Sequence, residues 1–150
     1  HLAEVEIDPD TGTVILARYI IVDDYGNMVN PMLTEGQVHG GTAQGIGQAS
    51  MEAVVYDTGS GQLLSGSLMD YTTPRATDMP FLDVHLGGPP TTANPLGVKG
   101  SGQAGAIGAP QAIVNAVHHA LAPFGIDRID MPLTSLRVWQ ALRGARLPAS

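Results

Sequence analysis

The residues best placed to do chemistry lie in a glycine-rich loop that runs into an expected helix. The loop reads PLGVKGSGQAGAIGAP, residues 95–110, and its polar side chains are those of Lys99, Ser101 and Gln103. Its five glycines lack a Cβ, so backbone amides there can approach a ligand closely. Pro110 fits the first turn of a helix, and amides that point out of a loop at a helix N-terminus form an anion site. The pattern predicts either such a site or a tight turn with close packing.

The same loop contains a match to a dinucleotide-binding fingerprint. Residues 100–105 read GSGQAG, which fits G-x-G-x-x-G, and Asp127 lies downstream at a suitable distance. That fingerprint follows directly on a buried strand in dinucleotide-binding folds, whereas the preceding TTANPLGVK contains Pro95 and Lys99 and is typical of a loop. The context therefore disfavours a dinucleotide-binding domain.

A resemblance to a known family covers nearly the whole chain. It is carried by AEVEIDPDTGTV (3–14), DDYGNMVNPMLTEGQVHGGTAQGIGQA (23–49), GSLMDYTTPRATDMP (66–80), NPLGVKGSGQAGAIGAP (94–110) and IDMPLTSLRVW (129–139). These ordered stretches are similar to the C-terminal part of the molybdenum-binding large subunit of the xanthine dehydrogenase, aldehyde oxidase and aerobic carbon monoxide dehydrogenase family. The resemblance implies an oxidoreductase with a molybdopterin cofactor, and it is strongest to members that use the cytosine dinucleotide form.

The resemblance also exposes a departure at the expected catalytic position. In the family the loop reads G-x-G-E, and the glutamate is the base that deprotonates a metal-bound hydroxyl. This chain has Gln103 at that position. A neutral amide cannot take up a proton near neutral pH, although it can still hydrogen-bond a ligand. The chain is therefore either a divergent paralogue with different chemistry or the carrier of a Glu→Gln change.

Further site residues are implied by the same resemblance. Gln37 falls where the family has a glutamine that contacts the pterin, and Asp24 is expected to hydrogen-bond the dinucleotide end of the cofactor. The remaining cofactor contacts are expected from Lys99, Gly100, Ser101 and Gly102. No metal ligand is expected from this chain. The implied partners are the rest of the large subunit and the iron-sulfur and FAD subunits or segments.

Composition excludes several other functions. The formal net charge is −7, and Lys and Arg form no cluster, which argues against nucleic acid and against anionic membrane surfaces. No apolar run approaches the ~18 residues of a spanning helix, and no signal peptide is evident, so we expect a cytoplasmic location. The chain has no cysteine, so it cannot hold an iron-sulfur cluster through thiolates.

Several local patterns predict the elements that position the loop. Alternation over 3–7 and 13–22, across the turn cluster DPDTG, predicts a β-hairpin. Asn30 and Pro31 predict a helix start, with the helix reaching about residue 51. Short strands are expected at 51–56 and 81–86. Thr134 is expected to cap a last helix that turns Leu136, Val138, Trp139 and Leu142 toward the core.

The helix expected from residue 31 is unusually rich in glycine, at positions 36, 40, 41, 45 and 47. Each glycine costs up to ~1 kcal/mol relative to alanine in a helix interior. Two explanations remain open: close packing of another helix, or passage of a cofactor against the backbone.

Together these patterns predict an α+β fold of hairpins and short strands with two or three packed helices. We expect residues 1–150 to form a C-terminal molybdopterin-binding fragment of a hydroxylase for an aldehyde, an N-heterocycle or carbon monoxide. The alternative, favoured by Gln103, is a non-catalytic binding or assembly module derived from that family. The isolated chain is expected to be inactive and to self-associate through exposed apolar surface.

Overall fold

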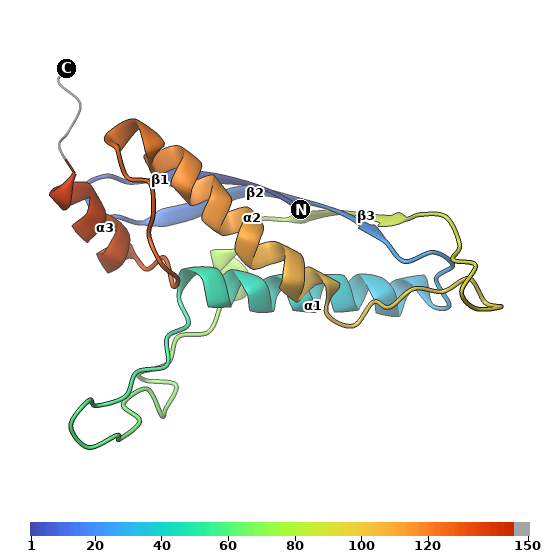
Figure 1. Cartoon of the computed structure of the whole chain (residues 1–150), viewed down its shortest axis with the longest axis horizontal. Coiled ribbons are helices and arrows are strands. Elements are labelled where there is room, and N and C mark those ends of the chain that lie inside the picture. The colour runs from blue at the N-terminus through green and yellow to red at the C-terminus, as the bar shows by residue number, and fades with distance from the viewer. Residues whose placement is uncertain (146–150) are drawn as a thin grey trace.

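A three-stranded sheet forms one layer of the molecule, and two long helices pack beside it (Figure 1). The computed structural model describes residues 1–145. Its strands are β1 (Leu2–Ile7), β2 (Val14–Asp24) and β3 (Leu82–Gly87), and its helices are α1 (Pro31–Ser50), α2 (Ala104–Leu121) and α3 (Ser135–Gly144). Two short 3₁₀ turns, η1 (Ala76–Asp78) and η2 (Ala122–Phe124), complete the order. The predicted α+β class is confirmed.

The predicted hairpin is formed by β1 and β2, which pair antiparallel. Asp8 closes the turn between them, because its carboxylate accepts hydrogen bonds from Asp10 N at 2.9 Å and Thr11 Oγ1 at 2.7 Å. Gly12 has a positive φ of 71°. A Cβ at Gly12 would lie 2.2 Å from Ser135 O, so this glycine allows the turn to touch α3.

An irregularity in the hairpin changes which β2 side chains face the helices. Glu4 pairs with Arg18 and Val5 with Leu16, so Ala17 is an extra residue on β2. Such a bulge shifts the alternation of side chains by one residue. Beyond it, Tyr19 and Ile21 are fully buried. The sequence alternation alone did not reveal this shift.

The third strand pairs with β2 in parallel, from Tyr19 opposite Leu82 to Asp24 opposite Gly87. Parallel pairing needs a long crossover, which α1 and the following loop supply. It brings the carboxyl ends of β2 and β3 to one edge of the sheet. There Tyr25 N donates to Gly87 O at 2.9 Å, which fixes the turn that leaves β2.

The N-terminus of α1 forms as its sequence predicts. The side chain of Asn30 accepts a hydrogen bond from Leu33 N at 3.1 Å, and Pro31 occupies the first helical position. Proline loses nothing at this position because the first amides of a helix have no partner within it.

Glycines divide α1 into a packed part and an open part. A Cβ at Gly45 would lie 2.7 Å from Ala109 Cβ, and one at Gly41 would lie 3.1 Å from Ala106 N. Among the described residues, no atom lies within 4 Å of a Cβ built at Gly36 or Gly40. Close helix packing therefore explains the glycines in the middle of α1, whereas those near its N-terminus leave room for another group.

The second helix begins earlier than Pro110 predicts. It starts at Ala104, so Pro110 lies inside the helix and not in its first turn. Pro110 is buried against α1, where a Cβ at Gly45 would lie 2.9 Å from its Cδ. Contacts of the preceding turn with α1 stabilise helix there, which offsets the hydrogen bond that the proline cannot donate.

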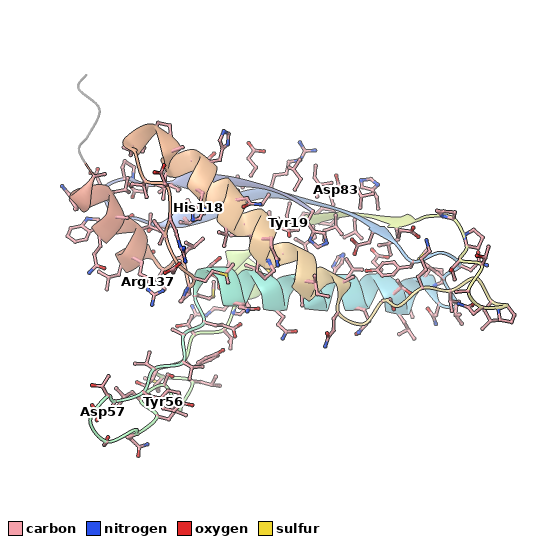
Figure 2. The ribbon with its side chains drawn as sticks, in the orientation of Figure 1. Tyr19, Tyr56, Asp57, Asp83, His118 and Arg137 are labelled. Carbon is pink, nitrogen blue, oxygen red and sulfur yellow. The ribbon has the colours of Figure 1, made fainter. Side chains whose placement is uncertain are left out.

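The segment between α1 and η1 extends away from the body as a loop (Figure 1). We call residues 52–74 the arm; Figure 2 shows Tyr56 and Asp57 at its far part. The expected strand at 51–56 is wrong. Only an isolated bridge joins Tyr56 to Leu63, and Val55 O accepts from Leu64 N at 2.8 Å. This segment pairs with its own neighbours and reaches no strand of the sheet, so a longer ladder does not form.

The last helix is capped as expected, since the Thr134 side chain accepts from Arg137 N at 3.4 Å. Val138 and Leu142 are buried. The expectation that Leu136 and Trp139 also face the core is wrong, because these side chains are 61% and 36% exposed. Helix α3 therefore packs on the core through a narrow stripe formed by Val138 and Leu142, which lie four residues apart.

Candidate functional site

The structure brings Gln37 beside the glycine-rich loop. Gln37 Nε2 donates a hydrogen bond to Gly102 O at 3.3 Å, although the two residues are 65 positions apart. The contact joins the N-terminal half of α1 to the segment that enters α2. The predicted site residues 37 and 99–102 therefore lie together.

A groove of about 400 Å³ opens at this junction. Its walls are the turn after β2, the first two turns of α1, and the loop at 98–101. Polar groups that line it include the side chains of Asn27, Thr34, Gln37, Lys99 and Ser101. The groove thus combines side-chain amides, hydroxyls and an ammonium group, which suits a polar ligand with anionic parts.

Lys99, which lines the groove, forms an ion pair with Asp24, which is not one of the lining residues. Lys99 Nζ lies 2.5 Å from Asp24 Oδ2, and Gly26 N donates to Asp24 Oδ1 at 2.9 Å. The hydrogen bond from Lys99, followed by that from the Gly26 amide, lowers the pKa of the Asp24 carboxyl. The carboxylate therefore stays ionised and holds the lysine beside the groove.

Two asparagines, which the sequence analysis did not single out, hold the loop in place. The Asn94 side chain donates to Val98 O at 2.9 Å and accepts from Val98 N at 3.2 Å. Asn27 Nδ2 donates to Leu96 O at 2.8 Å, and Asn27 N donates to Gly97 O at 3.0 Å. Gly97 has a φ of 68°, which explains the glycine in the N-P-x-G stretch. The N-P-x-G stretch is therefore the sequence feature from which a fixed turn in this loop could have been predicted.

Gln103 occupies the position just before α2. It has φ −125° and ψ 7°, and its side chain does not cap the helix. The residue is exposed, and its backbone carbonyl accepts from Ile107 N at 3.0 Å. The side-chain amide is therefore not committed to capping α2.

The glycines flanking Ser101 are not explained by packing. Within residues 1–145, no atom beyond the adjacent residues lies within 4 Å of a Cβ built at Gly100 or Gly102. Gly105, by contrast, lies directly on α1, where its Cβ would be 2.6 Å from Val38 O. The close-packing interpretation of the loop holds for Gly105, and the glycines on either side of Ser101 leave a space that a ligand can use.

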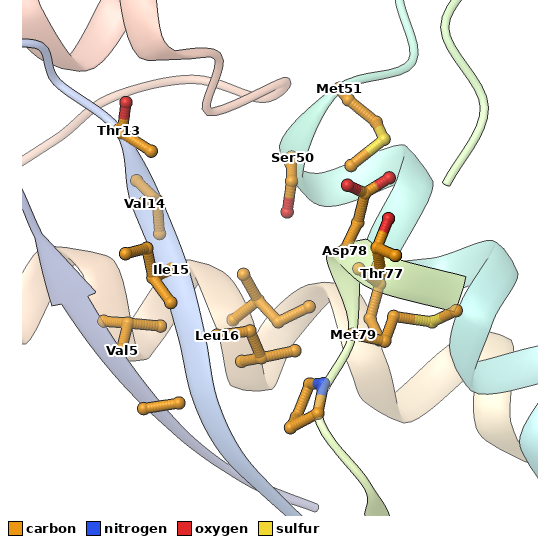
Figure 3. Close-up of a pocket in the computed structure, with 14 residues that line it drawn as sticks. Val5, Thr13, Val14, Ile15, Leu16, Ser50, Met51, Thr77, Asp78 and Met79 are labelled. Carbon is orange, nitrogen blue, oxygen red and sulfur yellow. The ribbon is translucent and has the colours of Figure 1, made fainter. Parts of the chain in front are cut away.

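A second cavity, of about 530 Å³, lies apart from these residues (Figure 3). Val14, Ile15 and Leu16 of β2 lie on one side of it, and Ser50 and Met51 lie across from them. Most of its lining is apolar. None of the predicted site residues reaches this cavity.

Residues 1–145, which the structure describes, lack a metal-ligand cluster and a helix able to span a membrane. No group of three or more His, Cys, Asp or Glu side chains in that range could hold a metal ion. None of the helices in the same range is long and apolar enough to cross a membrane.

Comparison with protein families shows to which family the chain belongs. Residues 1–80 match the family model described as "Molybdopterin cofactor-binding domain". The chain belongs to this family. Its first 80 residues include β1, β2, α1 and the arm, and hence Asp24 and Gln37.

Two relatives of the chain carry the names of large subunits of bacterial enzymes. The chain is 40% identical over 144 residues to the nicotine 6-hydroxylase large subunit of Paenarthrobacter nicotinovorans, covering 96% of this chain and 18% of that protein. It is 36% identical to the carbon monoxide dehydrogenase large chain of Hydrogenophaga pseudoflava, and the match covers 95% of this chain and 18% of that protein. The chain therefore spans about a fifth of the length of these relatives.

A solved structure shares the fold of this family member. The crystal structure of quinoline 2-oxidoreductase from Pseudomonas putida 86 matches with a TM-score of 0.90 and 39% identity, over 95% of this chain and 18% of that one. The resemblance found in the sequence to molybdenum-binding subunits is thus confirmed at the level of the family. The roles of individual residues remain predictions.

Proposed function

We propose that this chain is the C-terminal cofactor-binding segment of the large subunit of a molybdopterin-dependent hydroxylase. The observation that carries the proposal is the junction of Gln37 with Gly102 at the polar groove. It joins residues from both halves of the chain that the family resemblance assigns to the cofactor. Membership in the cofactor-binding family supports the same assignment.

The residues at the groove fit such a cofactor. The open space at Gly100 and Gly102 allows close approach to the backbone. Gln37 and Ser101 offer hydrogen bonds to the polar edge of a pterin, and Lys99 offers a positive charge to a phosphate. Asp24 then acts through Lys99, which it holds in place. When bound, molybdopterin would supply the metal-centred redox chemistry of a hydroxylation.

Gln103 limits what this chain can contribute to proton transfer. Its amide donates and accepts hydrogen bonds but does not take up a proton near neutral pH. We infer that it lies beside the metal and orients a ligand or substrate there. A proton acceptor would have to come from another part of the enzyme or from water.

The cytosine dinucleotide form is proposed from the sequence resemblance, with iron-sulfur and FAD groups on partner subunits or segments. The 6-hydroxypseudooxynicotine dehydrogenase complex subunit gamma of Paenarthrobacter nicotinovorans is a 35% identical relative named as part of a complex, which supports partner subunits. We propose an aldehyde, an N-heterocycle or carbon monoxide as the substrate and the cytoplasm as the location.

The alternative is a non-catalytic binding or assembly module, which Gln103 favours. The full-length protein that carries this segment distinguishes the two. We expect stoichiometric molybdenum and pterin in the purified protein, with substrate-dependent reduction of its redox centres. A protein without molybdenum and pterin would refute the cofactor site. A loaded protein that no substrate of the three classes reduces would support the non-catalytic alternative.

A further inference from the structure

An aspartate lies in the buried row of β2. Beyond the bulge, the side chains that face the helices are Tyr19, Ile21, Asp23 and Tyr25. The other three residues are at most 2% exposed, and the side chain of Asp23 is 13% exposed. A carboxylate largely removed from water is costly unless it is paired and hydrogen-bonded.

Asp23 has a partner on each of its oxygens. His1 Nε2 lies 3.3 Å from Oδ1, and Tyr25 Oη donates to Oδ2 at 2.7 Å. His1 Nδ1 lies 2.9 Å from Tyr19 Oη, and the two rings meet edge to face with centroids 5.7 Å apart. Tyr19, His1, Asp23 and Tyr25 therefore form one continuous polar path of two hydrogen bonds and one charged contact, which we call the buried relay.

The imidazole of the buried relay is held between the sheet and α2. Its side chain is 7% exposed. A Cβ at Gly108 would lie 2.8 Å from three atoms of the His1 ring. Gly108 is thus a glycine because the ring occupies the space of a side chain there. This contact ties the relay to the helix that Gln103 precedes.

The other end of the buried relay reaches the groove. Tyr25 lines the groove, and its backbone carbonyl accepts a hydrogen bond from Lys99 N at 3.1 Å. Burial, followed by the hydrogen bond to Asp23, raises the pKa of the Tyr25 hydroxyl. Tyr25 therefore remains a donor to Asp23 while its backbone fixes the position of Lys99.

We propose that Asp23 and His1 are positioning residues for the groove: they hold Tyr25, and through its backbone carbonyl they set Lys99. The inference rests on the proposed function only where it assigns the groove to the cofactor. The mechanical coupling of His1 to Lys99 is a property of the chain itself. Neither residue touches the groove.

The protonation of His1 gives a way to observe this coupling. With neutral imidazole, Tyr19 can donate to Nδ1 while the proton stays on Nε2, 3.3 Å from Asp23 Oδ1. Protonation makes both nitrogens donors, so the Tyr19 hydroxyl must turn and the charge on Asp23 is shared with an imidazolium. The residues that face the ring are Tyr19, Asp23 and, from α2, Gly108. The charged partner at Lys99 is Asp24.

The test uses NMR on this chain without cofactor, with Leu68→Ser and Met69→Ser present in every sample to limit association through the exposed arm. The His1 Cε1–H and the Lys99 amide are followed between about pH 5 and 8, where histidine titrates, and His1→Gln assigns the ring signal. We expect the Lys99 amide to shift with the midpoint of the His1 ring. In Tyr25→Phe the ring should still titrate, the Lys99 response should vanish, and exchange of the Lys99 amide should become up to about tenfold faster, as expected for one lost hydrogen bond.

The matched control is Tyr56→Phe, which removes the hydroxyl of a 59% exposed tyrosine on the arm. It should leave both titration curves unchanged. Asp23→Asn provides a second variant that keeps the shape of the side chain, and it too should uncouple Lys99. The inference is overturned if the Lys99 amide shift does not change with the titration of His1 when Tyr25 and Asp23 are intact. It is also overturned if the amide shift changes to the same extent in Tyr25→Phe.

A negative result for the coupling can be distinguished from a negative result for the proposed function. A full-length protein without molybdopterin would refute the cofactor site and leave the coupling intact. An uncoupled Lys99 in the present chain would refute the buried relay and leave the cofactor proposal as it stands.

Discussion

Gly105 at the start of α2 lies directly against the backbone of Thr42 in α1. A Cβ added to Gly105 would be 2.6 Å from Thr42 N and 2.9 Å from Thr42 Oγ1. Thr42 is completely buried, so the threonine cannot move aside into solvent. This contact sets the distance between α1 and α2, and thereby the place where Gln103 enters the site.

Gly105→Ala should therefore lower the free energy of unfolding. Overpacking a buried contact typically costs 1–3 kcal/mol, and we expect a loss of about 2 kcal/mol by urea unfolding. Gly40→Ala is the matched control, because it lies in α1 with no described atom within 4 Å of the added methyl. Equal effects of the two substitutions would contradict the packing argument.

Gly40→Ala should stabilise the folded chain. The substitution should raise the free energy of unfolding by up to ~1 kcal/mol, since alanine is the better helix former and the added methyl meets open space. Thermal and urea unfolding measure this gain. A loss of stability would mean that the space at Gly40 is filled in solution, for example by a second copy of the chain.

The Asp24–Lys99 pair should make stability depend on acidity. Because the pKa of Asp24 is lowered on folding, its stabilising contribution is complete above the unfolded aspartate pKa of about 3.9. The contribution is then lost as the pH falls through the lower folded value. The difference in unfolding free energy between the natural chain and Asp24→Asn should therefore shrink below about pH 4. A difference that is constant with pH would show that the pair does not stabilise the fold.

Gln103→Glu in the full-length enzyme tests the role inherited from the family. If the position hosts a general base, turnover should rise by about 10²–10⁴-fold. Molybdenum content should stay constant, because glutamate and glutamine have nearly the same shape and Gln103 makes no cap to α2. Kinetics at matched molybdenum content measure the effect. Equal turnover of the two forms would remove residue 103 from proton transfer.

The isolated chain should associate with itself and should retain no molybdenum. The arm exposes Leu68 by 82% and Met69 by 93%, and exposed apolar surface of this kind is typical of interaction sites. Light scattering over a range of concentrations should show growing particles, and Leu68→Ser with Met69→Ser should reduce them. Metal analysis of the same samples should find no stoichiometric molybdenum, since the groove is only part of a cofactor enclosure. A monomer at all concentrations would contradict the first expectation.

The sequence alone determined the elements whose signals are local. The turn at Asp8, the cap at Asn30 and the cap at Thr134 each depend on residues within a few positions, so their side chains specify the backbone directly. Motif matching also singled out Gln37 and the loop before α2. The family resemblance assigned both to the cofactor, but only the structure shows their contact across 65 residues.

Only the tertiary structure decided how these elements meet. The parallel pairing of β3, the bulge at Ala17 and the start of α2 before Pro110 all depend on partners distant in the chain. The inward-facing position of Asp23, paired with His1, has the same origin. Which face of a strand is buried, and which turn of a helix is stabilised, depends on what packs against it. Local propensity does not contain that information.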